Sequence, residues 1–169
     1  MPSLATIGVY CFTADTFLQT LHDADVTLLV DVRQRRGVRG PHFTWANARR
    51  LQTLLAGAGI GYSHHSELAP TTALRQLQYR EDDRVGVGKR SRELLAPEYV
   101  RRYVAEILDP APLESLAAEA PRTGAMALFC VECSAAACHR SLIAQRLTER
   151  HGFTVTHLVP PVPDGAPAA

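Results

Sequence analysis

The sequence predicts a single α/β domain built on a mostly parallel sheet of about five strands flanked by helices. Three observations support this fold class. Short β-prone runs alternate with amphipathic helical patterns, as in successive βαβ units. Residues 26–32 (VTLLVDV) are apolar along most of their length, as expected for a parallel strand buried on both faces. The length of 169 residues fits one domain with a substantial core, expected over residues 1–159.

The first half of the chain predicts strand, helix, strand, helix and strand in that order. Thr13 can cap the first helix, whose apolar face includes Phe17 and Leu21. Thr44 or Asn47 can cap the second helix, which Gly59 ends. The three strands are predicted over residues 6–10, 26–32 and 60–64.

Residues 66–97 interrupt this alternation. The segment is polar, charged and without clear periodicity, so it predicts a functional lid or a partly ordered insertion. Helical spacing returns at Pro97, and a shorter helix is expected up to Ala120. The last strand is predicted over residues 154–159, and the Pro- and Ala-rich tail 160–169 is expected to be disordered.

Charge and composition exclude several classes of protein. A net charge of +1 gives no global attraction to nucleic acid or membrane, so electrostatic recognition must depend on local clusters. No run is long enough to span a bilayer, and the first residues lack the features of a secretion signal. We therefore expect a cytoplasmic protein with no membrane partner. Its four cysteines are then expected to be thiols or ligands rather than disulfides.

Residues 125–152 carry the highest density of reactive side chains. An apolar run at residues 127–131 predicts a strand, small residues follow, and a helical pattern begins at Cys138 and stops at Gly152. A helix N-terminus attracts anions and lowers the pKa of a nearby thiol. The side chains gathered at this turn are Cys130, Glu132, Cys133, Cys138, His139 and Arg140.

Other polar residues follow the remaining strands. In an open parallel sheet, binding sites lie at the carboxyl ends of the strands. Asp31 and Arg33 are expected at the end of a central strand, beside the strand that carries Glu132. Tyr10 and His64 end two further strands. This convergence predicts one site on the carboxyl rim of the sheet.

A basic loop adds a second kind of signal. Arg35 and Arg36 lie between strand 26–32 and the next helix, and they predict either phosphate contact or a solvated surface. The GVGK run at residues 86–89 lacks the Ser or Thr of a phosphate-binding loop, so it predicts only a flexible loop.

Metal binding has partial support. Cys130 and Cys133 have a zinc-like spacing, with Cys138 and His139 nearby. Against a metal, Cys130 lies within a predicted strand and is expected to point into the core as a small hydrophobic residue, as is Cys11. The adjacent side chains of Cys138 and His139 are expected to diverge. We therefore predict no metal and no cofactor.

Taken together, these motifs resemble the domain-of-unknown-function 488 family. The resemblance rests on Thr6-Ile7-Gly8, Leu29 to Arg33, Tyr62-x-His64, Glu67-Leu68, and Cys130-Val131-Glu132 followed by Cys138-His139-Arg140. It runs from about Thr6 to Leu158 and implies a single Rossmann-like domain, but no general reaction. The chain departs from the usual pattern at Val9-Tyr10 and Ala69-Pro70, and Cys133 is an addition.

The leading hypothesis is an enzyme, a hydrolase or a transferase, that acts on a phosphate-bearing small molecule or nucleic acid. Asp31 or Glu132 would perform acid–base chemistry, and Cys138 would be the nucleophile with His139 or His64 as its base. Arg33, Arg140, Arg35, Arg36 and Tyr10 would bind the substrate. One alternative is a non-catalytic binding module that uses the arginine loop. Another is a metal- or thiol-based redox protein.

Overall fold

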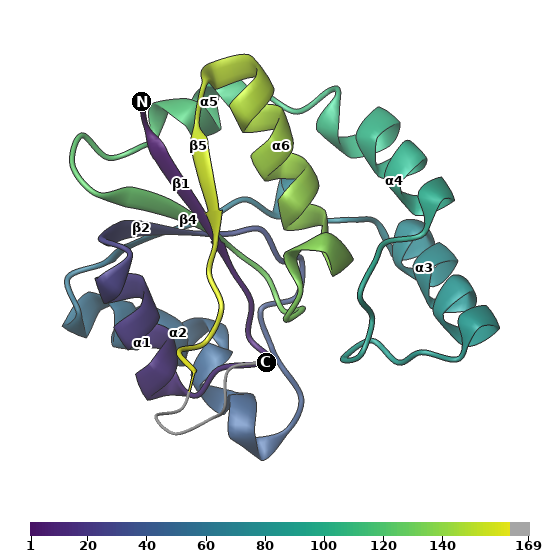
Figure 1. Ribbon diagram of the computed structural model, residues 1–169, viewed down its shortest axis with the longest axis horizontal. Coiled ribbons are helices and arrows are strands. Elements are labelled where there is room, and N and C mark those ends of the chain that lie inside the picture. The colour runs from purple at the N-terminus through teal and green to yellow at the C-terminus, as the bar shows by residue number, and fades with distance from the viewer. Residues whose placement is uncertain (163–169) are drawn as a thin grey trace.

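Five parallel strands form the central sheet of the computed structural model, which describes residues 1–162 (Figure 1). The strand order is β3-β2-β4-β1-β5, so the predicted single α/β domain with a parallel sheet is confirmed. Most of the predicted tail lies outside the described residues. The strands are β1 (Ser3–Ile7), β2 (Val26–Asp31), β3 (Gly61–His64), β4 (Ala125–Phe129) and β5 (Thr154–His157).

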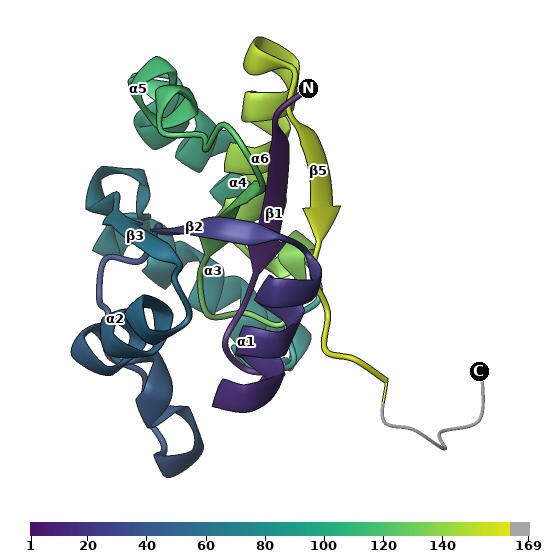
Figure 2. The ribbon, with the colours of Figure 1, turned by 90° about the vertical axis from the view of Figure 1, so that its left-hand side faces the viewer.

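Helices cover both faces of the sheet (Figures 1 and 2). α1 (Ala14–Asp23) and α2 (Ala48–Gly57) pack on one face. The helices that pack on the other face are α3 (Thr72–Val85), α4 (Pro97–Tyr103), α5 (Leu113–Ala118) and α6 (His139–His151). Among residues 1–162, no helix is both long enough and apolar enough to cross a membrane.

The two core layers follow from the alternation of side chains along β4. Ala127 and Phe129 contribute to the core beneath α1 and α2, whereas Met126 and Leu128 contribute to the core beneath α4 and α6. Every residue of β4 is buried, as expected for the middle strand of a parallel sheet covered on both faces. β2 lies directly beside β4, which confirms that the strand ending at Asp31 neighbours the strand that leads to Glu132.

Some element boundaries differ from the prediction. β1 occupies Ser3–Ile7 rather than residues 6–10. Val9 and Tyr10 lie in the loop after β1, and their amide groups both donate to the carbonyl oxygen of Val131. This bridge holds the loops that follow β1 and β4 together. Asn47 occupies the N-cap position of α2, but its side chain accepts a hydrogen bond from the Val38 amide instead of capping the helix.

The segment 66–97 contains more regular structure than its sequence indicated. α3 occupies residues 72–85, and Thr71 caps it by accepting a hydrogen bond from the Leu74 amide. The remaining short elements are the 3₁₀ turns η1 (Pro41–Ala46), η2 (Ser66–Leu68) and η4 (Ala135–Ala137), and the π-helical turn η3 (Val104–Leu108) that continues α4. A lid function for this segment stays a prediction.

The expectation that all four cysteines are free is wrong in this structure. Cys11 and Cys133 form a disulfide bond, whereas Cys130 and Cys138 are free and buried. The two bonded residues are 122 positions apart in the sequence. They meet because β1 and β4 are paired parallel strands whose following loops leave the same end of the sheet. The pairing depends on tertiary structure, so the spacing of the cysteines did not reveal it.

Candidate active site

A cleft of about 760 Å³ opens where the loops after β1, β2 and β4 meet the segment between α3 and α4. Basic and aromatic side chains form its walls, and the β4–α6 loop contributes thiols, a carboxylate and an imidazole. We call it the basic cleft. The lining residues that matter for its chemistry are Tyr10, Arg35, Arg39, Arg75, Tyr79, Lys89, Arg90, Arg92, Tyr99, Cys130, Glu132, Cys138 and His139.

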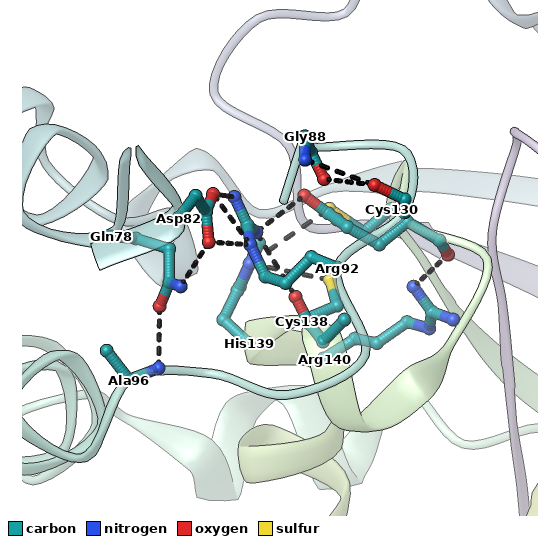
Figure 3. Close-up of polar contacts among 12 residues, drawn as sticks. Gln78, Asp82, Gly88, Arg92, Ala96, Cys130, Cys138, His139 and Arg140 are labelled. Atoms are coloured by element: carbon teal, nitrogen blue, oxygen red, sulfur yellow. Dashed lines mark hydrogen bonds and ion pairs between the residues drawn. The ribbon is translucent and has the colours of Figure 1, made fainter. Parts of the chain in front are cut away.

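Three of these side chains form a compact group that we call the thiol–imidazole cluster: Cys130, Cys138 and His139 (Figure 3). Cys130 directly follows β4, Cys138 is the N-cap of α6, and His139 is the first residue of that helix. His139 Nδ1 lies 3.7 Å from Cys138 Sγ and 4.0 Å from Cys130 Sγ. All three residues are buried, and the three donor atoms lie within 4.8 Å of one another.

The orientation of the His139 ring is fixed by the backbone. Its Nε2 atom lies 3.0 Å from the carbonyl oxygen of Val32. Because a carbonyl oxygen can only accept, Nε2 carries the proton, and Nδ1 faces the two sulfur atoms. The expectation that Cys138 and His139 diverge is therefore wrong. Cys138 has extended backbone angles (φ −140°, ψ 143°), so the two side chains do not follow helical spacing.

Glu132 stands beside this cluster and is held by a buried ionic network. Cys130 Sγ lies 3.6 Å from Glu132 Oε2, and Arg92 Nη1 lies 3.6 Å from Glu132 Oε1. Arg92 also donates to both carboxylate oxygens of Asp82. Asp82 accepts a further hydrogen bond from Gln78 Nε2 (Figure 3). α3 therefore supports the carboxylate of the site through Arg92.

One protein-family model matches most of the chain. The family model described as "Domain of unknown function DUF488" matches residues 13–147, which include β2, β4, the thiol–imidazole cluster and Glu132. The chain belongs to the DUF488 family. Searches of curated proteins and of solved structures found no match.

The two thiols of this DUF488 chain have opposite acidities. Burial alone would raise the pKa of Cys138, but a hydrogen bond from Cys130 and the positive charges of His139 and Arg140 hold that pKa well below its usual value. The pKa of Cys130 is raised well above its usual value because its thiol donates to Cys138 and because it is buried. Burial, followed by the Cys138 thiolate, raises the pKa of Glu132 to about 7.

Several residues predicted from the sequence line the basic cleft together. Cys138, His139 and Glu132 form its reactive part, and Tyr10 and Arg35 lie on its walls. Arg90 lies over the Tyr10 ring, with the guanidinium carbon 5.2 Å from the ring centroid. The structure thus brings together residues that are more than a hundred positions apart in the chain.

Asp31 and Arg33 form a buried ion pair with each other. Arg33 Nε donates to Asp31 Oδ1 at 2.9 Å, and Nη2 donates to Oδ2 at 2.8 Å. The third guanidinium nitrogen, Nη1, donates to the carbonyl oxygen of Ala46. Asp31 accepts one more hydrogen bond from the Tyr62 hydroxyl and is fully buried. Although Arg33 borders the cleft, this geometry favours a structural role for the pair over acid–base chemistry or anion binding.

Three other predicted residues lie outside the lining of the basic cleft. Arg140 is buried and donates to the carbonyl oxygens of Glu132 and Cys133, so it fixes the β4–α6 loop. His64 Nε2 pairs with the carbonyl oxygen of Arg33. Arg36 donates to the Tyr62 hydroxyl at 3.3 Å.

Sequence analysis missed the contribution of residues 78–92. Lys89, which belongs to the GVGK run, lines the cleft, and the charge of Glu132 raises its pKa even though burial opposes this. Gln78 and Asp82 are buried on α3, four residues apart and in line with Leu74. This i, i+4, i+8 spacing is the sequence pattern that could have predicted the buried face of α3. Two of its three residues are polar, so the pattern is not one of apolar periodicity.

Proposed function

We propose that this DUF488 chain is an enzyme that acts on a phosphate-bearing substrate, which binds in the basic cleft with its reacting bond above the thiol–imidazole cluster. One observation carries the proposal. Four cations of the cleft wall, Arg35, Arg39, Lys89 and Arg90, form no ion pair with any carboxylate of residues 1–162. The whole chain has a net charge of only +1, so this positive charge is local to the cleft.

The reactive groups suit hydrolysis or transfer of a phosphate ester. Glu132 is the carboxylate that lines the basic cleft, and Arg92 orients it. From this position Glu132 can move a proton to or from the attacking or leaving oxygen. Guanidinium and ammonium groups on the walls would stabilise the negative charge on the transferring phosphate.

Aromatic side chains on the walls support a nucleotide or nucleic acid as the substrate. Tyr10 lies edge-on to Phe43, with ring centroids 5.5 Å apart, and Arg90 lies over both rings. Tyr79 is another wall residue and is 38% exposed. Exposed tyrosine and arginine planes are surfaces on which a nucleobase can stack.

Binding can be tested with inorganic pyrophosphate, measured by calorimetry. We expect Arg35→Ala to weaken pyrophosphate binding about tenfold, because one charge-assisted contact is lost. Arg36→Ala is the matched control, since Arg36 is adjacent in sequence but points to Tyr62 instead of the cleft. Equal losses in the two variants, or none in either, would contradict the assignment of the cleft as the phosphate site.

Turnover separates an enzyme from a binding module. With bis(4-nitrophenyl) phosphate as the probe, we expect the wild-type protein to release nitrophenol. Glu132→Gln should lose at least about 100-fold in rate. The same variant should still bind pyrophosphate, because the wall cations remain. Binding without turnover in the wild-type protein would instead favour a non-catalytic module that uses its arginine side chains.

A further inference from the structure

The thiol–imidazole cluster has the composition of a metal site. Two sulfur atoms and one imidazole nitrogen converge from the end of β4 and from the start of α6. These donors lie at the boundary between the core and the basic cleft. Cys133, which the sequence spacing had paired with Cys130 as a ligand, is removed from the set by its disulfide bond to Cys11.

The separations of the donor atoms fit tetrahedral coordination. With Zn–S bonds of about 2.3 Å and Zn–N bonds of about 2.05 Å, tetrahedral angles place sulfur and nitrogen ligands about 3.6 Å apart. Nδ1 of His139 lies 3.7 Å from one sulfur and 4.0 Å from the other. A shift of a few tenths of an ångström would therefore close the site around the ion.

The hydrogen bond from His139 to Val32 is an independent indication. Ligating histidines commonly donate their second ring N–H to a backbone carbonyl, which fixes the tautomer and aims the free nitrogen at the metal. His139 shows this arrangement, with Nε2 bonded to the Val32 carbonyl and Nδ1 directed at the sulfur atoms. Neither Cys138 nor His139 serves as a side-chain cap of α6, so helix capping does not explain their positions.

We propose that Cys130, Cys138 and His139 bind one zinc ion. Two thiolates and an imidazole are a donor set that zinc favours, and three protein ligands leave a fourth position for water or substrate, as in catalytic zinc sites. Glu132 Oε2 lies 3.6 Å from the sulfur of one proposed ligand, Cys130. Cys138 is then a ligand rather than an attacking thiolate. The inference goes beyond the proposed function, since the ion would bind whether or not the substrate carries a phosphate.

Metal analysis of the purified protein tests the inference. We expect about one zinc ion per chain in the wild-type protein. Cobalt(II) added to the chelator-treated protein should give the absorption bands of a tetrahedral thiolate complex. Cys138→Ser and His139→Gln should each lower zinc affinity at least 100-fold. The double variant Cys11→Ser/Cys133→Ser, which also lacks two cysteines, should keep the wild-type zinc content and cobalt spectrum.

Two results would overturn the inference. One is that the wild-type protein contains no zinc and that its cobalt complex shows no thiolate bands. This measurement does not depend on the folding of any variant. The other is zinc binding that Cys138→Ser does not weaken, which would show that the ion binds elsewhere than at the thiol–imidazole cluster. Pyrophosphate binding by the zinc-free protein is measured separately, so loss of the metal site and loss of the phosphate site are distinguishable.

Discussion

At the scale of single residues, the pair formed by Asp82 and Arg92 connects stability to the site. Burial alone would raise the pKa of Asp82, but hydrogen bonds from Arg92 and Gln78 outweigh it and lower that pKa below its usual value. A carboxylate whose pKa is depressed on folding stabilises the protein above the pKa of the unfolded chain. That stabilisation is lost as the pH falls through the folded-state pKa. It is therefore present at neutral pH and disappears below about pH 4.

We predict that Asp82→Asn lowers the free energy of unfolding by about 3 kcal/mol at pH 7, because it leaves the buried Arg92 without its main partner. The difference between the variant and the wild-type protein should shrink as the pH is lowered from 4 to 2. Urea unfolding at each pH measures it. Asp83→Asn is the control, since Asp83 is exposed and next in sequence. A difference that does not depend on pH would refute the assigned role of the Asp82 carboxylate.

At the scale of elements, the close approach of the loops after β1 and β4 depends on Gly8. A Cβ atom at Gly8 would overlap the carbonyl oxygen of Glu132, which also accepts from Arg140. We predict that Gly8→Ala destabilises the protein by about 2 kcal/mol and displaces Glu132. Gly57→Ala on α2 has open space and should stabilise by about 0.5 kcal/mol. Thermal unfolding of both variants is the measurement, and similar shifts in the two would argue against a steric requirement at Gly8.

The predicted lid can now be assigned to a smaller element. The middle and the C-terminal turn of α3 are held in place, because Gln78 accepts a hydrogen bond from the Ala96 amide and Asp82 pairs with Arg92. Gly86 and Gly88 lie between Asp82 and Arg92 in the chain and precede Lys89. We predict that amides of residues 72–85 exchange slowly and those of residues 86–91 exchange rapidly, with protection of residues 86–91 when pyrophosphate binds. Rapid exchange throughout α3 would instead support a lid that includes the helix.

At the scale of the whole molecule, the Cys11–Cys133 disulfide joins residues that are 122 positions apart in the sequence. A cross-link of that span restricts the unfolded ensemble, so reduction should lower the free energy of unfolding by about 2–4 kcal/mol. Urea unfolding with and without reductant tests this expectation. The Cys11→Ser/Cys133→Ser variant should not respond to reductant, and an equally large response in that variant would refute it.

The sequence predicted the sheet because apolar strands and amphipathic helices are local patterns. Contacts between side chains depend on tertiary structure, so they were harder to predict from the sequence. Asp31 and Arg33 were predicted as site residues because they are charged and lie at the end of a strand, but in the structure Arg33 follows β2 and pairs with Asp31. Lys89 was predicted to lie only in a flexible loop, because the GVGK run does not complete a phosphate-loop motif, whereas in the structure Lys89 lines the basic cleft.

The proposed function depends most directly on phosphate binding in the basic cleft. A crystal structure of the wild-type protein grown with inorganic phosphate would test this directly. We predict a phosphate ion between Lys89 and the thiol–imidazole cluster, with Arg35 or Arg90 within hydrogen-bonding distance. A vacant cleft, with phosphate bound only at exposed arginines such as Arg49 and Arg50 on α2, would contradict the central claim.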